Sequence, residues 1–163
     1  MERTAQCHCG SLRAIAVGQP RMGRWSERLA RPFLSFADIA PGGRVLDVAC
    51  GTGVLTKALA AVGADVIGID ASEGYLEGAR RHRSHPNITY QHGDIRQKRF
   101  DDGAFDAAVY TLALDVIPET ERVVAEMKRV TRPGGVVASG VHQFLGGMPA
   151  FNPWRKSKCH GVQ

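Results

Sequence analysis

The chain has 163 residues, 19 of them Gly, and a formal net charge of +5. This length fits one domain with a single core. No apolar stretch approaches the roughly 20 residues that span a bilayer, and the first residues lack the apolar segment of a signal peptide. We therefore expect a cytoplasmic protein without a membrane partner, whose four Cys remain thiols.

Basic residues are concentrated in two runs, at positions 80–83 and 155–158. Such runs can mark a nucleic-acid partner. They are also typical of a solvated helix face and a charged tail, which is the interpretation that we favour here.

Residues 1–22 do not continue into the pattern that follows, and we expect a poorly ordered extension. The segment Cys7-His8-Cys9-Gly10 resembles the opening Cys-x-Cys-Gly segment of the glutathione-dependent formaldehyde-activating enzyme family, which has a zinc-binding β fold. That resemblance covers about a dozen residues. The additional cysteines of such a site are absent, and a zinc site needs at least three protein ligands, so we predict no metal site.

From residue 23 the apolar residues recur at helical spacing. Trp25, Leu29, Phe33 and Ile39 belong to this pattern, and Pro-Gly-Gly at 41–43 ends it. The spacing predicts a helix over 23–39 that lies on the lid side of the first strand.

The next stretch, Arg44-Val-Leu-Asp-Val-Ala-Cys-Gly-Thr-Gly-Val-Leu-Thr-Lys57, predicts a strand, a tight turn and a helix. Gly51 and Gly53 permit positive φ and a close approach of a ligand. A dinucleotide site requires a third glycine where Thr56 stands. Asp47 at the strand end would repel a pyrophosphate but suits a cation. These features favour S-adenosylmethionine (SAM), which has a sulfonium, an ammonium and no phosphate.

The run 64–70 is apolar and β-branched, which predicts a buried parallel strand that ends in Asp70. An acid at this place, about 20 residues after the glycine turn, can accept hydrogen bonds from both ribose hydroxyls. Ser72 is suited to be the N-cap of the next helix. Further along, the pattern predicts helices over 72–82 and 119–130 and strands over 87–91, 105–110 and 136–141.

The segment Val45-Leu-Asp-Val-Ala-Cys-Gly-Thr-Gly53 resembles the first motif of class I SAM-dependent methyltransferases, with Ala49 in place of the first glycine. The run Lys-Arg-Val-Thr-Arg-Pro-Gly-Gly-Val at 128–136 resembles a late motif of the same family. Together the motifs cover about residues 24–150, and the nearest subgroup is the type 11, small-molecule branch. The resemblance implies an α/β fold over residues 23–145: a Rossmann-like open, mainly parallel sheet of order 3-2-1-4-5 flanked by helices.

The resemblance also implies a set of site residues. Asp94 and Ile95 fit the place where the family binds adenine, and Arg24 lies in the segment that closes over SAM. Asp115 and His142 follow strands four and five and are the candidates for taking a proton from the acceptor. The full cofactor-binding set is Asp47, Ala49, Gly51, Thr52, Gly53, Asp70, Ala71, Ser72, Asp94, Ile95, Thr111 and Arg24.

The acceptor is predicted to be a small organic molecule. Enzymes that methylate DNA bases resemble one another in an Asn/Asp-Pro-Pro-Tyr motif after strand four, where this chain has Tyr110-Thr-Leu-Ala. We therefore expect no nucleic-acid partner.

Few residues follow strand five, and they lead into a basic tail over 146–163. We expect the sheet to lack the family's usual last two strands, which would leave strand five as a free edge that a homodimer could cover. Three alternatives stay open beside an active methyltransferase: a truncated, inactive SAM-binding module, an NAD-dependent oxidoreductase, and a zinc protein built on Cys7 and Cys9.

Overall fold

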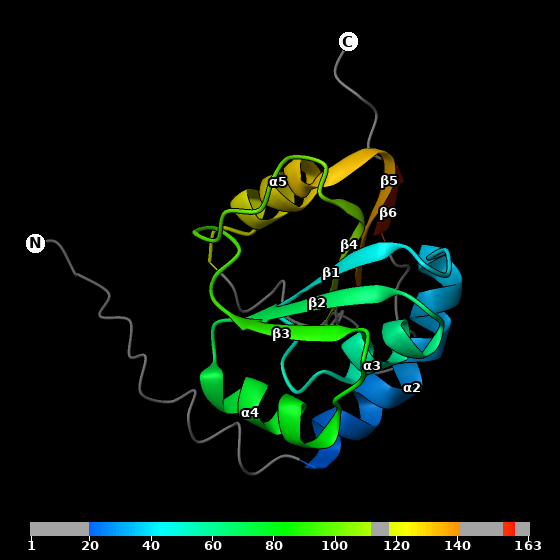
Figure 1. Ribbon diagram of the computed structural model, residues 1–163, viewed down its shortest axis with the longest axis vertical. Coiled ribbons are helices and arrows are strands. Elements are labelled where there is room, and N and C mark those ends of the chain that lie inside the picture. The colour runs from blue at the N-terminus through cyan, green and yellow to red at the C-terminus, as the bar shows by residue number, and fades with distance from the viewer. Residues whose placement is uncertain (1–19, 112–117, 141–154, 159–163) are drawn as a thin grey trace, which may run out of the picture.

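The computed structural model describes residues 20–111, 118–140 and 155–158, with side chains described for 26–111 and 118–140. Helices and strands alternate along most of the described chain (Figure 1). In chain order the elements are α2 (Pro20–Ala37), β1 (Arg44–Val48), α3 (Val54–Ala61), β2 (Asp65–Asp70), α4 (Glu73–His82), β3 (Ile88–His92), β4 (Phe105–Thr111), α5 (Thr120–Val130), β5 (Thr131–Gly140) and β6 (Arg155–Lys158).

The strands form one sheet of order β3-β2-β1-β4-β5-β6. The first five pair in parallel, which confirms the predicted order 3-2-1-4-5. Neighbouring strands are in close register, with Asp47 of β1 between Gly68 of β2 and Val109 of β4. The C-terminal ends of β1 and β2 therefore meet at one edge of the sheet, where open α/β sheets bind ligands.

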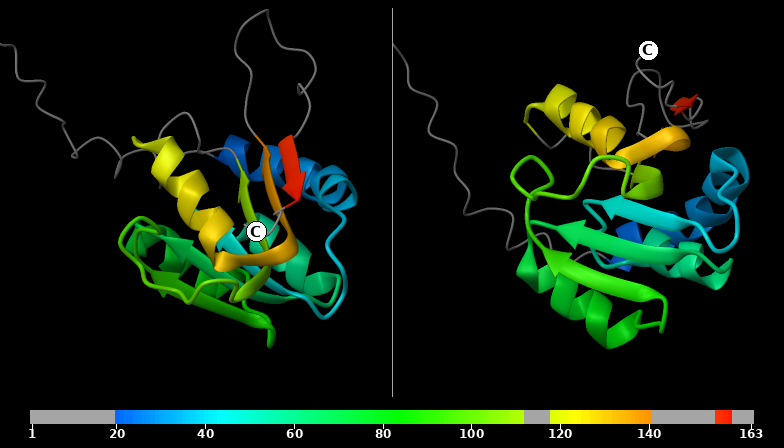
Figure 2. Two further views of the ribbon diagram at one scale, coloured as in Figure 1. Left: turned by 90° about the horizontal axis from the view of Figure 1, so that it is seen from above. Right: turned by 45° about the horizontal axis from the view of Figure 1, so that its top comes forward.

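Two hydrophobic cores cover the two faces of the sheet. Successive strand residues point to opposite faces: Val45 and Val66 pack with α2 and α3, whereas Leu46 and Ile67 pack with α5. Helices α2, α3 and α4 lie on one side of the sheet and α5 on the other (Figure 2, right). Among the described residues, no helix is sufficiently long and apolar to span a membrane.

The end of the sheet differs from the prediction. Residues 155–158, which we expected in a basic tail, form β6 and pair antiparallel with β5, from Val136 opposite Lys158 to Ser139 opposite Arg155 (Figure 2, left). The expectation of a free β5 edge is therefore wrong. With that edge paired inside the chain, the reason for a homodimer through it is removed.

Two elements begin earlier in the chain than predicted. Helix α2 begins at Pro20, before the predicted start at residue 23, and continues through Pro32. Proline is well suited to a first helical turn, because its missing N–H would have no partner there. Strand β5 begins at Thr131, five residues before the predicted start, and its pairing with β4 shifts register between Phe105 and Ala107.

Candidate cofactor site

The glycine turn lies between β1 and α3 and contains three residues with positive φ: Ala49 at 53°, Gly51 at 55° and Gly53 at 79°. A Cβ built on Gly51 would have no atom within 4 Å, so the space beside this residue is open. A Cβ on Gly53 would lie 2.3 Å from the hydroxyl of Tyr90. Gly51 therefore faces the room for a ligand, whereas Gly53 is required by packing inside the protein.

Asp70 links the glycine turn to the segment after β2. Its Oδ2 accepts a hydrogen bond from the Gly51 N–H at 2.8 Å, and its Oδ1 accepts one from the Ser72 N–H at 2.8 Å. Burial raises the pKa of Asp70, while the two backbone N–H groups and nearby His92 oppose that rise. Each carboxylate oxygen has about two lone-pair sites. Asp70 therefore keeps one acceptor position on each oxygen for a pair of ligand hydroxyls.

The segment after β2 is also held from β3. The Nε2 atom of His92 lies 3.0 Å from the carbonyl oxygen of Ala71. Ser72 stands at the N-cap position of α4 as predicted, but its side chain makes no capping hydrogen bond, and its N–H points to Asp70 instead. The Ser72 N–H therefore orients the Asp70 carboxylate directly, and the His92 contact holds the backbone between these two residues.

Asp47 is inaccessible in this structure, with 1% of its surface exposed. Thr56, which is fully buried in the first turn of α3, donates a hydrogen bond of 2.6 Å from Oγ1 to the Asp47 carboxylate. Burial raises the pKa of Asp47 to about 7. Because Asp47 is buried, it can act on a cationic ligand only through its charge and not through direct contact, and that charge is fully present only above about pH 7. The same bond explains why Thr stands where a dinucleotide site would have glycine.

Cys50 joins the turn to β2, because its backbone N–H donates to the Ile69 carbonyl at 3.0 Å. Burial and the nearby carboxylates of Asp47 and Asp70 raise the pKa of its thiol far above the ordinary value. The thiolate is the nucleophilic form of cysteine, so Cys50 is a packing residue and not a nucleophile.

Asp94 lies after β3 and is paired with Arg96. Its Oδ1 accepts from the Arg96 N–H and from Nε, both at 2.9 Å, and its Oδ2 accepts from Nε and Nη2. Arg96 also donates from Nη1 to the Pro118 carbonyl at 2.9 Å. The guanidinium lowers the pKa of Asp94. Its neighbour Ile95 is buried in the core on the α5 side.

The remaining predicted residues are placed as follows. Thr111 is the half-buried last residue of β4, and Arg24 lies in α2, where side chains are described only from residue 26. Asp115, His142 and the Cys7-His8-Cys9 segment lie outside the described residues. Within the described ranges, no group of three or more His, Cys, Asp or Glu side chains could hold a metal ion.

Two residues that sequence reasoning missed hold the glycine turn. The Tyr90 hydroxyl fills the space beside Gly53 and donates to the Arg83 carbonyl at 3.0 Å. Burial raises the pKa of Tyr90 to about 12. Arg83 in turn donates from Nη1 to the Thr52 carbonyl at 3.2 Å. Neither residue belongs to a local motif, and only the strand order brings them to the turn.

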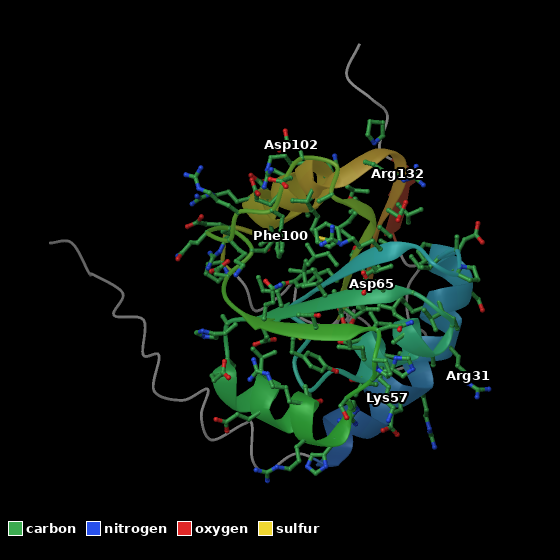
Figure 3. All side chains as sticks on the ribbon, viewed as in Figure 1. Arg31, Lys57, Asp65, Phe100, Asp102 and Arg132 are labelled. Atoms are coloured by element: carbon green, nitrogen blue, oxygen red, sulfur yellow. The ribbon has the colours of Figure 1, made fainter. Side chains whose placement is uncertain are left out.

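A separate hollow of about 540 Å³ lies between residues 96–102 and α5. Phe100 and Asp102, which border it, lie at the α5 end of the molecule, far from Lys57 of α3 (Figure 3). Its lining mixes four basic and three acidic side chains with Gln97 and Phe100, and includes no residue of the glycine turn. The candidate cofactor site is therefore built on the turn and Asp70 and not on this hollow.

Comparison with known proteins identifies the family of this chain. A family model described as a methyltransferase domain matches residues 46–139, which is more than half of the chain. The chain belongs to the methyltransferase domain family. The resemblance to class I SAM-dependent methyltransferases is thereby confirmed.

Three similar proteins carry names from the same class. The demethylmenaquinone methyltransferase of Renibacterium salmoninarum is 38% identical over 143 residues, which are 86% of this chain and 54% of that protein. The ubiquinone biosynthesis O-methyltransferase of Methylococcus capsulatus is 38% identical over 112 residues, 67% of this chain and 47% of that protein. The chain thus spans about half the length of these relatives. A crystal structure of an S-adenosylmethionine-dependent methyltransferase from Mesorhizobium loti has 28% identity and a TM-score of 0.61, and covers 73% of this chain and 53% of that one.

Proposed function

We propose that this chain binds SAM between the glycine turn and Asp70 and transfers its methyl group to a small organic acceptor. The observation that carries the proposal is the Asp70 carboxylate, which accepts hydrogen bonds from the N–H groups of Gly51 and Ser72 beside the open space at Gly51. Such a carboxylate has one remaining acceptor position on each oxygen, which fits the two hydroxyls of a ribose.

The charges around the turn support a cationic ligand. The carboxylate of Asp70 lies sufficiently close to Asp47 to contribute to the raised pKa of Asp47. The negative charge of Asp70, together with that of Asp47 where Asp47 is ionised, repels phosphate and attracts a sulfonium or an ammonium. The remaining predicted binding residues, including Ala71, Thr111 and Arg24, stay proposals on the same grounds.

The chemistry requires alignment more than acid–base assistance. SAM supplies a methyl group made electrophilic by the positive sulfur. The turn and Asp70 would hold the nucleoside so that the acceptor atom, the methyl carbon and the sulfur lie in line, which removes much of the entropic cost of the reaction. The acceptor atom gains the methyl group as the carbon–sulfur bond breaks, and the acceptor then loses a proton. Asp115 and His142 remain the proposed residues for receiving that proton.

The names of the relatives narrow the acceptor class. One is named for demethylmenaquinone and another for ubiquinone biosynthesis. We therefore propose a reduced quinone or a related hydroxylated aromatic ring as the acceptor to test first.

Titration calorimetry with SAM and with its demethylated product, S-adenosylhomocysteine (SAH), tests the cofactor. Transfer of tritiated methyl from SAM to a panel that includes reduced demethylmenaquinone tests the reaction. Binding together with transfer supports the proposal. Binding without transfer to any acceptor would indicate an inactive SAM-binding module. Tighter binding of NADH than of SAM would indicate an oxidoreductase, and tight, salt-sensitive capture of DNA or RNA in a filter assay would overturn the small-molecule acceptor.

A further inference from the structure

Arg83 contacts two segments that are distant in the sequence. It follows the last residue of α4, and its Nη1 donates to the Thr52 carbonyl in the glycine turn at 3.2 Å. Its Nη2 lies 3.3 Å from Oε1 of Glu27 on α2. In Figure 1 the end of α4 lies beside the first half of α2. One planar guanidinium thus joins α2, α4 and the turn.

The backbone of Arg83 also makes hydrogen bonds, one through its N–H and one through its carbonyl. Its N–H donates to the Ala79 carbonyl at 2.7 Å, and its carbonyl accepts from the Tyr90 hydroxyl at 3.0 Å. The same hydroxyl lies against Gly53. The turn is therefore supported at Thr52 by Arg83 and at Gly53 by Tyr90, and these two supports are bonded to each other.

The contact at Thr52 fixes the orientation of one peptide group. In a planar trans peptide the C=O and the N–H point in opposite directions. The Thr52 carbonyl faces Arg83, and the Gly53 N–H of the same peptide donates to the Cys50 carbonyl at 2.9 Å. Because both ends of this peptide are bonded, the neighbouring Gly51 N–H can remain directed at Asp70.

The ion pair between Arg83 and Glu27 is the weaker of the two side-chain contacts of Arg83. The Glu27 side chain is 62% exposed, and a pair with such exposure contributes little to stability. The bond from a charged donor to the Thr52 carbonyl is the stronger contact, and it acts on the turn itself.

We infer that Arg83 is a positioning residue for the methyl donor: it holds the Thr52–Gly53 peptide in the orientation that aims the Gly51 N–H at Asp70, and it ties α2 beside the turn. This inference rests on the proposed function, because the turn is taken as the SAM site. Arg83 acts through the turn and need not touch the ligand.

The test measures SAH binding by calorimetry for the wild type, Arg83→Met, Arg83→Lys and Glu27→Gln. Arg83→Met should raise the Kd about tenfold, since it removes one charge-assisted hydrogen bond. Arg83→Lys keeps a donor and should recover part of the loss. Glu27→Gln keeps the carbonyl contact and should stay within about twofold of the wild type. Arg81→Met, which changes an exposed residue near the end of α4, is the matched control.

A merely structural role would lower the melting temperature and not the affinity of the folded protein. We expect the melting temperature of Arg83→Met to stay within about 3 °C of the wild type, while the KM for SAM rises and kcat is unchanged. If the wild type binds SAH and Arg83→Met binds it equally well, this inference is wrong and the proposed function stands. If the wild type binds neither SAM nor SAH, the proposed function fails and the inference fails with it.

Discussion

The Thr56 hydroxyl donates a hydrogen bond of 2.6 Å to the Asp47 carboxylate beneath the glycine turn, and both residues are buried. A carboxylate with a single side-chain donor in a buried place is costly to ionise, because burial removes its hydration. The free energy of unfolding therefore depends on whether Asp47 is protonated, and the raised pKa sets the direction of that dependence.

We predict that Asp47 makes the protein less stable as the pH rises from about 4 to 7. The pKa of Asp47 is raised from 3.8 to about 7 in the folded protein. Across that interval the folded state keeps a proton that the unfolded state has lost, so the free energy of unfolding falls with rising pH. Asp47→Asn should remove this slope and, at pH 8, unfold with a free energy roughly 2 to 4 kcal/mol higher than the wild type. Denaturant unfolding of the wild type and of Asp47→Asn between pH 4 and 8 measures this slope.

Asp106→Asn is a control, because Asp106 should change the stability with pH in the direction opposite to Asp47. Arg132 and the Arg44 N–H lower the pKa of Asp106, so its contribution to stability is present above the ordinary Asp pKa and is lost as the pH falls. Asp106→Asn should therefore reduce stability at neutral pH. Equal pH slopes in the wild type and Asp47→Asn would contradict the account of the buried pair.

The order of the first five strands could be predicted because each carries its own signal. Buried parallel strands are nearly continuous apolar runs, and Gly51 and Gly53 mark the turn between β1 and α3. β6 could not be predicted. Its sequence is Arg-Lys-Ser-Lys, which has no apolar alternation, and it is a strand only because it can pair with the edge of β5.

Local sequence signals also indicated which residues would lie at the glycine turn. Asp70 ends its strand about 20 residues after the glycine turn, and its carboxylate lies at that turn. The partners of the turn residues, Tyr90 and Arg83, come from β3 and the end of α4, and no local pattern links them to it. Asp47 was expected to face a ligand, but a strand-end acid can equally be buried, and its bond to Thr56 decides between the two.

Asp70→Ala should weaken SAH binding by about 1.5 to 3 kcal/mol, which is roughly 10- to 150-fold in Kd, because hydrogen bonds to a charged acceptor are lost. Calorimetry measures it, with Asp65→Ala as the control, since Asp65 is exposed at the opposite end of the same strand (Figure 3). An SAH analogue without the ribose 2′-hydroxyl should lose less on the same substitution. Unchanged affinity for SAH in Asp70→Ala would refute the ribose role.

Gly51 and Gly42 offer a matched pair. Both have positive φ, 55° and 80°, and a Cβ on either would meet no atom within 4 Å. Alanine at each position should therefore cost a similar strain energy of about 1 to 2 kcal/mol. Only Gly51→Ala should also reduce SAH binding, and Gly51→Val should reduce it further, because the side chain enters the space proposed for the ligand. If Gly42→Ala impairs binding as much, the loss follows from strain and the proposed location is wrong.

Gly53→Ala should behave differently from Gly51→Ala. Its φ is 79°, and the new Cβ would lie 2.3 Å from the Tyr90 hydroxyl, which is bonded to Arg83. Strain and the clash together should lower the free energy of unfolding by about 2 to 4 kcal/mol. Denaturant unfolding checks this value. The double variant Gly53→Ala, Tyr90→Phe, compared with Tyr90→Phe alone, should recover part of the loss by removing the clashing oxygen. The ring carbon Cζ would still lie 2.9 Å from the new Cβ, so no recovery would assign the cost to backbone strain and this ring contact.

Arg96→Gln should strengthen SAH binding by a few-fold, if Asp94 accepts the adenine amino group as proposed. Arg96 makes four contacts with the Asp94 carboxylate, because Nε donates to both oxygens while the backbone N–H and Nη2 donate to one each. A carboxylate has only about four acceptor positions. The amino group must therefore displace a donor of Arg96, and glutamine removes that competition. The substitution should also return the lowered pKa of Asp94 toward its ordinary value, which a carboxyl NMR titration would follow. Arg99→Gln, an exposed neighbour, is the control, and weaker binding in Arg96→Gln alone would mean that Arg96 helps to hold the ligand.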